Sequence, residues 1–200
     1  MELGLLIFVL VLALGFIGNL IRVREKIHHS PLIQTKPDSF QRKNEVFYEI
    51  CFCLWWLQLF LYSLAPTFIL DLFPSIYSAF FIFDPIGYVA LYAGLILFVT
   101  SIISLGDSWR IGIDNEEPGP LVMKGLYKHI RHPIYTGVFL MLLGSLLILP
   151  NIVSLFLSLC CGLGVLLEAH FEEQFLLSRY KFRYEEYMKT TGRFLPKKLF

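Results

Sequence analysis

Hydrophobic residues along this chain fall into long runs, and most of the polar residues are confined to the segments between them. A membrane-spanning helix needs about 20 apolar residues, and the first three runs have membrane-spanning length. A fourth apolar block, 134–167, is too long for one span and is broken at Pro150-Asn151, a strong turn signal. The pattern predicts five spans, at 3–21, 46–70, 86–105, 134–149 and 152–170.

The last two spans form a tight hairpin in this prediction. Each arm has about 16 apolar residues, which at about 1.5 Å per residue reach only about 24 Å, so both ends of each arm lie near the membrane surface. Residues 71–85, between the second and third spans, are expected to form a short aromatic connection. The predicted fold is an all-α integral-membrane helical bundle in a single domain, 1–200, with a carboxyl-terminal hairpin and an interfacial helix.

The interfacial helix is predicted from the segment that follows the hairpin. Aromatic side chains such as Phe175, Tyr180 and Tyr184 are interleaved there with basic ones, a composition typical of a helix in the membrane interface. The segment ends in Gly-Arg-Phe-Leu-Pro at 192–196. Placed after the hairpin, it is suited to close over a site at the membrane surface.

The basic residues are distributed asymmetrically along the chain. All 17 lie in three segments, 22–43, 110–131 and 179–198, which five spans place on one face. The positive-inside rule makes that face cytoplasmic, with the amino terminus outside and the carboxyl terminus inside. We therefore expect an integral membrane protein, in the plasma membrane of a prokaryote or the endoplasmic reticulum of a eukaryote, with its polar chemistry at the cytoplasmic surface.

Composition narrows the classes of function. Of 200 residues, 56% are hydrophobic and 16% charged, which leaves no room for a separate soluble catalytic domain or a doubly wound nucleotide-binding sheet. A net charge of +1 predicts no nucleic-acid partner. A di-iron site needs histidine clusters. The five histidines are too few for two metals, and Arg131 and Pro133 interrupt the cluster of His129 and His132, so no metal is predicted.

The polar segment between the third and fourth spans, Trp109–Gly137, carries the candidate chemistry. Pro133 is expected at the first position of the fourth span, which leaves the next backbone N–H groups unpaired at the positive end of a helix dipole. With Arg131 and His132 beside them, these donors suit a small anion such as a carboxylate or phosphate. The alternative is a basic anchor that pairs with lipid headgroups.

Acidic residues at the end of the fifth span complement this basic site. Glu168, Glu172 and Glu173 follow sixteen uncharged residues, so they lie at the interface, where acids are unfavourable unless partnered. The hairpin places them beside the start of the fourth span, and we expect them to face Arg131 and His132. An interhelical ion pair would need only one of them. Three acids leave at least one for hydrogen bonds to hydroxyls or an amine.

These motifs make the sequence recognisable. Their order and spacing resemble the isoprenylcysteine carboxyl methyltransferase family of integral-membrane enzymes, and phospholipid methyltransferases are similar but more distant. The resemblance covers about the carboxyl-terminal half. It is carried by Gly125-x-Tyr127-x-x-x-Arg131-His132-Pro133-x-Tyr135-x-Gly137, then the hairpin, then Glu172-Glu173 and Tyr184-x-x-Tyr187.

The resemblance implies S-adenosyl-L-methionine as the cofactor and a cofactor-binding core at 107–200. The methionine carboxylate would suit the helix start and His132, and Glu172 would suit a ribose hydroxyl or the cofactor's amine. The residues that match the family's cofactor contacts are Gly119, Pro120, Leu121, Val122, Tyr127, His132, Pro133, Ile134, Tyr135 and Glu172.

The resemblance also implies a lipophilic, prenylated methyl acceptor, reached from the bilayer. Arg131 and Glu168 are the candidates closest to it. In the eukaryotic isoprenylcysteine enzymes an arginine implicated in substrate binding stands where Glu168 stands here, so another lipid amine or thiol is an alternative acceptor. No catalytic residue is assigned, because methyl transfer from a sulfonium to an ionised carboxylate needs placement rather than a general base.

Two other classes remain as alternatives. Sterol-type membrane reductases that use NADPH share a similar Arg-His-Pro core, although they usually have more spans and more basic residues for the cofactor phosphates. A transporter or non-catalytic scaffold should carry polar residues near the bilayer midplane. The charges here are expected at one face, which favours the methyltransferase.

Overall fold

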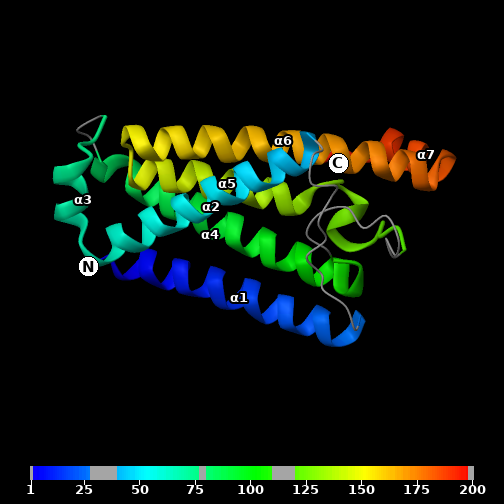
Figure 1. The fold of residues 1–200 in the computed structure, drawn as a ribbon, viewed down its shortest axis with the longest axis horizontal. Coiled ribbons are helices and arrows are strands. Elements are labelled where there is room, and N and C mark those ends of the chain that lie inside the picture. The colour runs from blue at the N-terminus through cyan, green and yellow to red at the C-terminus, as the bar shows by residue number, and fades with distance from the viewer. Residues whose placement is uncertain (1, 28–39, 77–79, 110–119, 198–200) are drawn as a thin grey trace.

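The computed structural model describes residues 2–27, 40–76, 80–109 and 120–197, and within these ranges the chain is helical with two isolated bridges and no strand. The all-α prediction is therefore confirmed. Figure 1 shows the long helices running side by side. The helices are α1 (Leu3–Ile27), α2 (Phe40–Leu64), α3 (Pro66–Leu72), α4 (Phe80–Leu105), α5 (Pro133–Ile148), α6 (Ile152–Tyr180) and α7 (Phe182–Thr190), with two 3-10 turns, η1 (Gly106–Ser108) and η2 (Gly125–Lys128).

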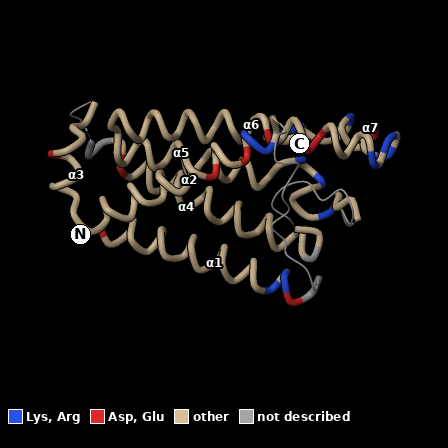
Figure 2. Tube along the Cα trace, in the orientation of Figure 1, with Lys and Arg blue, Asp and Glu red and all other residues tan. Residues whose placement is uncertain are grey.

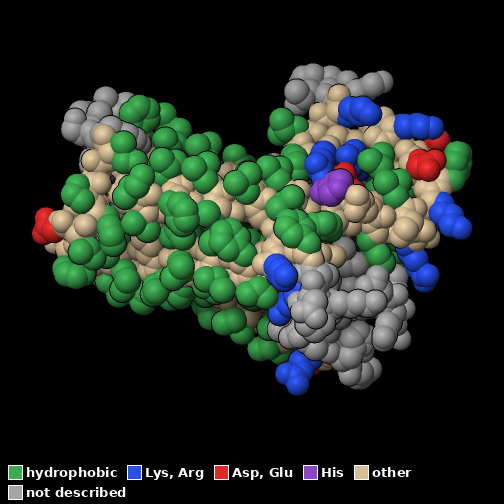
Figure 3. Space-filling view, turned by 45° about the horizontal axis from the view of Figure 1, so that its top comes forward, with side chains coloured by type: hydrophobic (Ala, Val, Ile, Leu, Met, Phe, Trp, Pro, Cys, Tyr) green, Lys and Arg blue, Asp and Glu red, His purple; other side chains and the backbone are tan. Residues whose placement is uncertain are grey.

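Four of these helices, α1, α2, α4 and α6, are long and apolar enough to cross a membrane, and α5 is a shorter apolar helix. Together they correspond to the five predicted spans. The two termini lie at opposite ends of the bundle (Figure 1), as an odd number of crossings requires. Lys and Arg gather at the end that holds the carboxyl terminus (Figure 2), and hydrophobic side chains cover most of the rest of the visible surface (Figure 3).

The predicted second span, 46–70, is wrong at both ends. α2 starts earlier, at Phe40, and ends at Leu64, and the short helix α3 begins at Pro66. Proline lacks an N–H and clashes with the carbonyl four residues before it, so Pro66 ends α2 and starts a new helix. Ala65 between them has left the helical conformation, with φ −137° and ψ 67°.

The aromatic connection 71–85 is shorter than predicted, because α4 already begins at Phe80 and contains Pro85. The fifth span also continues past its predicted end at 170. α6 runs unbroken to Tyr180 and absorbs the start of the predicted interfacial helix. Lys181, with a positive φ of 46°, then ends α6. The separate interfacial segment is reduced to α7.

Glycines bring α4 and α5 into direct backbone contact. A methyl group added to Gly94 would lie 2.6 Å from the carbonyl oxygen of Gly137, and one added to Gly87 would lie 2.9 Å from that of Gly144. Two glycine pairs seven residues apart thus line one seam. Small residues of this kind allow membrane helices to pack closely without a hydrophobic driving force. This seam fixes the start of α5 against α4.

Hydrogen bonds tie α6 to α2 inside the bundle. Gln58 of α2 donates to Asn151 Oδ1 at 3.1 Å and to Ser154 Oγ at 3.0 Å. Further along, the Asn44 amide donates to the carbonyl of Gly164 at 3.2 Å. Gly164 also leaves no room for a side chain beside Tyr48, so the two helices pack closely at this glycine. These contacts hold the acidic end of α6 between α2 and α5.

Candidate cofactor and acceptor site

His132 stands at the start of α5, at the basic end of the bundle. It is the residue before the first helical position, which Pro133 occupies, and only 4% of it is exposed. Its carbonyl accepts from the amide of Thr136 at 3.1 Å. The amides of the first helical turn before Thr136 have no partner within the helix, so the positive end of the α5 dipole lies at His132.

Both ring nitrogens of His132 face acids from α6. Nδ1 lies 3.4 Å from Oε2 of Glu172, and Nε2 lies 3.1 Å from Oε1 of Glu173. Burial lowers the pKa of His132, but hydrogen bonds and negative charge from the two carboxylates outweigh it and raise the pKa above its usual value. The predicted juxtaposition of the acids with Arg131 and His132 is therefore correct for Glu172 and Glu173.

Glu173 is the centre of a buried ion-pair network. Its Oε1 accepts from Nε of Arg131 at 2.9 Å as well as from His132, and its Oε2 lies 3.3 Å from Nε of Arg193. Its side chain is 11% exposed, whereas that of Glu172 is 40% exposed. Glu173 thus links α6 to the residues before α5 and after α7, and Glu172 is the acid that remains accessible to a ligand.

The chain after α7 returns to the site and pairs with the residues before α5. The amide of Arg131 donates to the carbonyl of Gly192 at 2.8 Å, and that of His132 donates to the carbonyl of Arg193 at 3.0 Å. A side chain at Gly192 would collide with the backbone of Leu195, so this tight turn requires glycine. The predicted closing role of 192–196 agrees with this placement.

Aromatic rings enclose His132. Tyr135 stacks on its imidazole, with ring centroids 5.4 Å apart and planes at 14°, and the ring of Phe194 lies 5.9 Å away. Phe194 in turn packs edge-on against Phe139, and its carbonyl accepts from the hydroxyl of Thr136 at 2.7 Å. The imidazole is consequently held in one orientation.

Three further tyrosines complete the enclosure. The hydroxyl of Tyr187 donates to the carbonyl of Tyr127, which ties α7 to η2. Burial, with the negative charge of Glu172, raises the pKa of Tyr127 well above its usual range, so its phenol stays protonated. Tyr184 is 1% exposed, and its buried hydroxyl has no hydrogen-bond partner among the described residues.

The structure brings together five of the predicted cofactor residues: Tyr127, His132, Pro133, Ile134 and Tyr135 lie in η2 and the start of α5. A sixth, Glu172, reaches this group from α6. Its carboxylate faces His132 and lies beside the hydroxyl of Tyr135.

The other predicted cofactor residues lie in the segment between η1 and η2. Pro120 is exposed, and its carbonyl accepts from the hydroxyl of Ser108 at 3.5 Å. Leu121 and Val122 are half-buried. Gly119 lies outside the described residues. A role for this segment in cofactor binding stays a prediction.

Glu168 lies apart from the basic cluster and faces α2. It is 4% exposed, and its Oε1 accepts from the amide of Gln41 at 3.5 Å, while its Oε2 is buried with no hydrogen-bond partner among the described residues. The same amide donates to Glu45 at 3.0 Å, so one group bridges two buried acids. The expectation that Glu168 faces Arg131 and His132 is wrong, because it lies one helical turn before Glu172 and contacts a different helix.

Two residues outside the predicted cofactor set are central to the geometry. Glu173 and Arg193 form the ion-pair network, and Nη2 of Arg193 is buried with no hydrogen-bond partner among the described residues. Glu173 was visible in the sequence as the second of two adjacent acids. In the sequence Arg193 is recognisable as a basic residue between Gly192 and Phe194. Its ion pair with Glu173, 20 residues earlier in the chain, could not be predicted from the sequence.

These groups fit the donors and acceptors of S-adenosyl-L-methionine. The free backbone amides at the α5 start offer N–H groups to a carboxylate, and the accessible Glu172 offers oxygens to hydroxyls or an ammonium. The buried, unpartnered groups of Arg193 and Tyr184 are further polar positions that a ligand could satisfy. In the described part of the chain, no group of three His, Cys, Asp or Glu side chains could hold a metal ion.

An apolar helical bundle with a buried ion-pair network at its basic end is typical of integral-membrane proteins whose polar chemistry lies at the membrane surface. Comparison with known sequences assigns the chain within this class. The sequence profile of the phospholipid methyltransferase family matches residues 83–183. This chain belongs to that family, which confirms the resemblance to integral-membrane methyltransferases.

A relative of known function also supports the assignment to membrane methyltransferases. The chain is similar to the protein-S-isoprenylcysteine O-methyltransferase of Schizosaccharomyces pombe, with 28% identity over 134 residues. The matched region is 66% of this chain and 54% of the relative, so it covers about half the length of that protein.

Proposed function

We propose that the protein is an S-adenosyl-L-methionine-dependent methyltransferase that acts on a lipophilic acceptor. The observation that carries this proposal is the meeting of His132 with the accessible acid Glu172 at the end of an apolar bundle. Family membership supports the reaction class. The apolar helices around the site support an acceptor that arrives through the bilayer.

In this proposal the residues at the start of α5 bind the amino-acid part of the cofactor. The free amides after Pro133 hold its carboxylate beside the positive charge of His132, and Glu172 accepts hydrogen bonds from its ammonium or ribose hydroxyls. The bound cofactor supplies a methyl group on a positively charged sulfur. Tyr127 and Tyr135 line the same space with protonated phenols and aromatic faces, which suit that charge.

The protein's contribution to the reaction is placement and exclusion of water. The 192–194 turn covers the start of α5, and the rings of Tyr135 and Phe194 enclose the imidazole. An acceptor oxygen, nitrogen or sulfur held in line with the methyl–sulfur bond then needs no covalent intermediate. Loss of hydration would strengthen the acceptor as a nucleophile.

The first candidate acceptor is the carboxylate of a prenylated cysteine. The similarity to the Schizosaccharomyces pombe protein-S-isoprenylcysteine O-methyltransferase supports it. A carboxylate acceptor is ionised at neutral pH and attacks without a general base. Arg131 is committed to Glu173 and to the carbonyl of Thr191, so the charge of an acceptor carboxylate would have to be met by other groups.

The second candidate is a lipid amine, and Glu168 favours it. This carboxylate is buried one turn from Glu172, with one oxygen unpartnered among the described residues. An acid at this place offers no counter-ion to a carboxylate, whereas it can accept the proton of an ammonium before the amine attacks. The name of the matching family, phospholipid methyltransferase, is compatible with such an acceptor.

The proposed arrangement places the site at the cytoplasmic face. The basic end of the bundle holds the site, and an excess of Lys and Arg is typical of the cytoplasmic side (Figure 2). The amino terminus is then outside and the carboxyl terminus inside, in the plasma membrane or the endoplasmic reticulum. A water-soluble cofactor would enter from the cytoplasm and the lipophilic acceptor from the side.

Isothermal titration of the purified protein in detergent tests the proposed cofactor. We expect binding of S-adenosyl-L-methionine and of its demethylated product, and no binding of NADPH. Binding of NADPH without S-adenosyl-L-methionine would replace the methyltransferase by a membrane reductase.

A further inference from the structure

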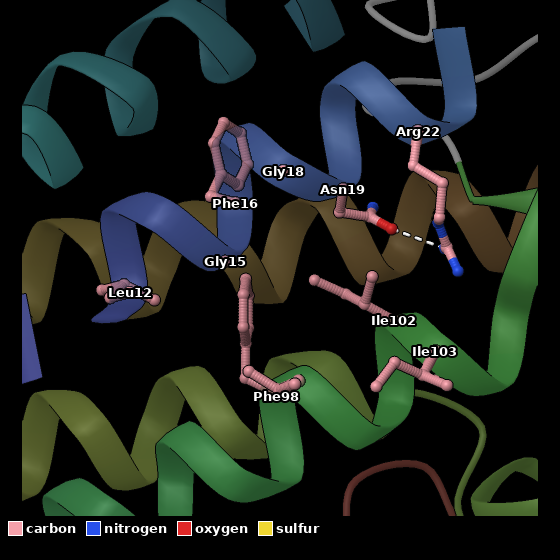
Figure 4. A pocket seen from close by; sticks show the side chains of 10 residues that line it. Leu12, Gly15, Phe16, Gly18, Asn19, Arg22, Phe98, Ile102 and Ile103 are labelled. Carbon is pink, nitrogen blue, oxygen red and sulfur yellow. Dashed lines mark hydrogen bonds between the residues drawn. The ribbon is translucent and has the colours of Figure 1, made fainter. Parts of the chain in front are cut away.

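A groove lies between α1 and α4 (Figure 4). Its walls are apolar and come from both helices, and α5 contributes no lining residue. Ile103 on its rim is 61% exposed, so the groove opens at the surface of the bundle. The apolar wall consists of Leu12, Phe16, Phe98, Val99, Ile102 and Ile103.

Two glycines of α1 keep this groove open. A methyl group added to Gly15 or to Gly18 would meet no atom within 4 Å, whereas one added to Gly94 or Gly137 would collide with the neighbouring helix. A glycine inside a helix is less favourable than alanine by about 1 kcal/mol. Close helix packing offsets this at the α4–α5 seam. In the described part of the chain, no neighbouring helix approaches Gly15 or Gly18, so the absence of a side chain there leaves free space in the groove.

The groove has a polar end. Nη2 of Arg22 donates to Oδ1 of Asn19 at 2.6 Å. Nδ2 of Asn19 is buried and has no hydrogen-bond partner among the described residues, and no carboxylate in that part of the chain pairs with Arg22. Arg22 belongs to the first basic segment, on the same side as the other basic residues. A positive charge and a free donor therefore close one end of an apolar slot.

We propose that the α1–α4 groove binds an anionic membrane phospholipid, with an acyl chain along the glycines and the phosphate on Arg22 and Asn19. The occupant must be apolar over several turns and negatively charged at one end, and the cytoplasmic leaflet of a bilayer supplies such molecules. All the residues that line the groove belong to α1 and α4, whereas the candidate cofactor site is built from η2, the start of α5 and α6.

A second copy of the chain fits the groove less well. A parallel pair of α1 helices around a two-fold axis would bring two Arg22 side chains to the same end, where like charges repel. It would also leave the Asn19 donor without an acceptor. A phosphate satisfies both groups at once, through charge-assisted hydrogen bonds.

Native mass spectrometry of the intact protein in detergent tests the headgroup contact. Phosphatidylglycerol and phosphatidylcholine with identical acyl chains are added, and the lipid retained by the protein is measured. We expect retention of phosphatidylglycerol, and a loss of about fivefold in Arg22→Gln, from about 1 kcal/mol per basic group. Arg24→Gln is the matched control, because Arg24 is exposed and does not line the groove.

A filled groove tests the acyl-chain contact. The double variant Gly15→Leu, Gly18→Leu is expected to lose phosphatidylglycerol, while Gly15→Ala, Gly18→Ala, which raises helix propensity without filling the space, keeps it. Equal retention of the two lipids, or equal losses in Arg22→Gln and Arg24→Gln, would overturn the proposal. So would unchanged binding in the leucine variant, or a dimer that this variant converts to monomer. If the leucine variant does not fold, the two arginine variants still decide.

Discussion

His132 and Glu172 meet across the α5–α6 hairpin, with Nδ1 of the imidazole 3.4 Å from Oε2 of the carboxylate. His132 directly precedes α5, and Glu172 lies in α6. His132 is buried and oriented by Tyr135 and Glu173, while the Glu172 side chain is 40% exposed. A buried donor beside an accessible acid is an arrangement suited to a ligand that carries both a carboxylate and an ammonium.

We expect His132→Gln and Glu172→Gln to weaken binding of S-adenosyl-L-methionine by at least about tenfold, since a hydrogen bond to a charged group contributes about 1.5–3 kcal/mol. Isothermal titration of each variant measures the effect. Glu186→Gln is the matched control, because Glu186 pairs with Lys189 on the exposed face of α7. Unchanged affinity in both site variants would remove the assigned cofactor site.

The raised pKa of His132 predicts a pH dependence. The stabilisation from its protonated form is fully present below the pKa of an unfolded histidine, about 6.5, and is lost as pH rises through the higher folded value. We therefore expect both thermal stability and cofactor affinity to fall as pH rises above that value. Thermal unfolding and titration from pH 6 to 9 measure this, and His132→Gln should flatten both profiles. A wild-type profile that rises with pH would contradict the assigned ion pairs.

Glu173 is expected to matter for stability more than for binding. Glu173→Gln leaves Arg131, His132 and Arg193 with one fewer negative partner, and breaking a buried ion pair reduces the free energy of unfolding by about 3–5 kcal/mol. We predict a large drop in the thermal unfolding midpoint. The same substitution at Glu172 should change the midpoint little, because that acid is more exposed. Equal effects of the two variants on stability would show that their roles are not divided in this way.

The glycine seam between α4 and α5 gives a prediction at the level of a single methyl group. Gly137→Ala would place its Cβ 2.7 Å from the carbonyl of Gly94, and overpacking of this kind destabilises by about 1–3 kcal/mol. Gly162→Ala is the matched control, since its Cβ would lie 3.6 Å from Phe139, an ordinary contact. Thermal unfolding should separate the two. A Gly137→Ala protein as stable as Gly162→Ala would mean that the helices do not approach this closely.

Glu168 separates the two candidate acceptors. If the acceptor is a lipid amine, Glu168→Gln should lower kcat on that amine by about 100-fold or more, as expected for loss of a group that accepts a proton. Cofactor affinity should remain unchanged, because Glu168 faces α2 rather than His132. If the acceptor is a prenylcysteine carboxylate, the same variant should keep or gain activity. Glu168→Arg sharpens the comparison, since it restores the charge found in the eukaryotic isoprenylcysteine enzymes.

The sequence predicted the helical bundle and the juxtaposition of Glu172 and Glu173 with His132. Length of apolar runs and the Pro150-Asn151 turn suffice to locate the hairpin, because both signals are local. The hairpin then brings Glu172 beside His132 without further information. The charge pattern likewise indicated which end of the bundle holds the polar groups.

The errors arose where contacts between distant segments decide the structure. The apolar character of 46–70 hides the break at Pro66, which interrupts backbone hydrogen bonds without changing hydropathy. Glu168 and Glu172 share a helix face, yet α2 contacts the first and α5 the second, and sequence spacing does not specify which helix packs where. The pairing of Gly192 with Arg131 joins residues about 60 apart, so no local pattern could reveal it.

The central claim is methyl transfer to a lipophilic acceptor at this site. Its most direct test supplies the purified protein with S-adenosyl-L-methionine labelled in the methyl group, and with either a prenylated cysteine or a total lipid extract. We predict that label enters the organic phase with the wild-type protein and that His132→Gln and Glu172→Gln reduce the transfer strongly. Binding of the cofactor with no transfer to either acceptor, or equal transfer by wild type and both variants, would contradict the account.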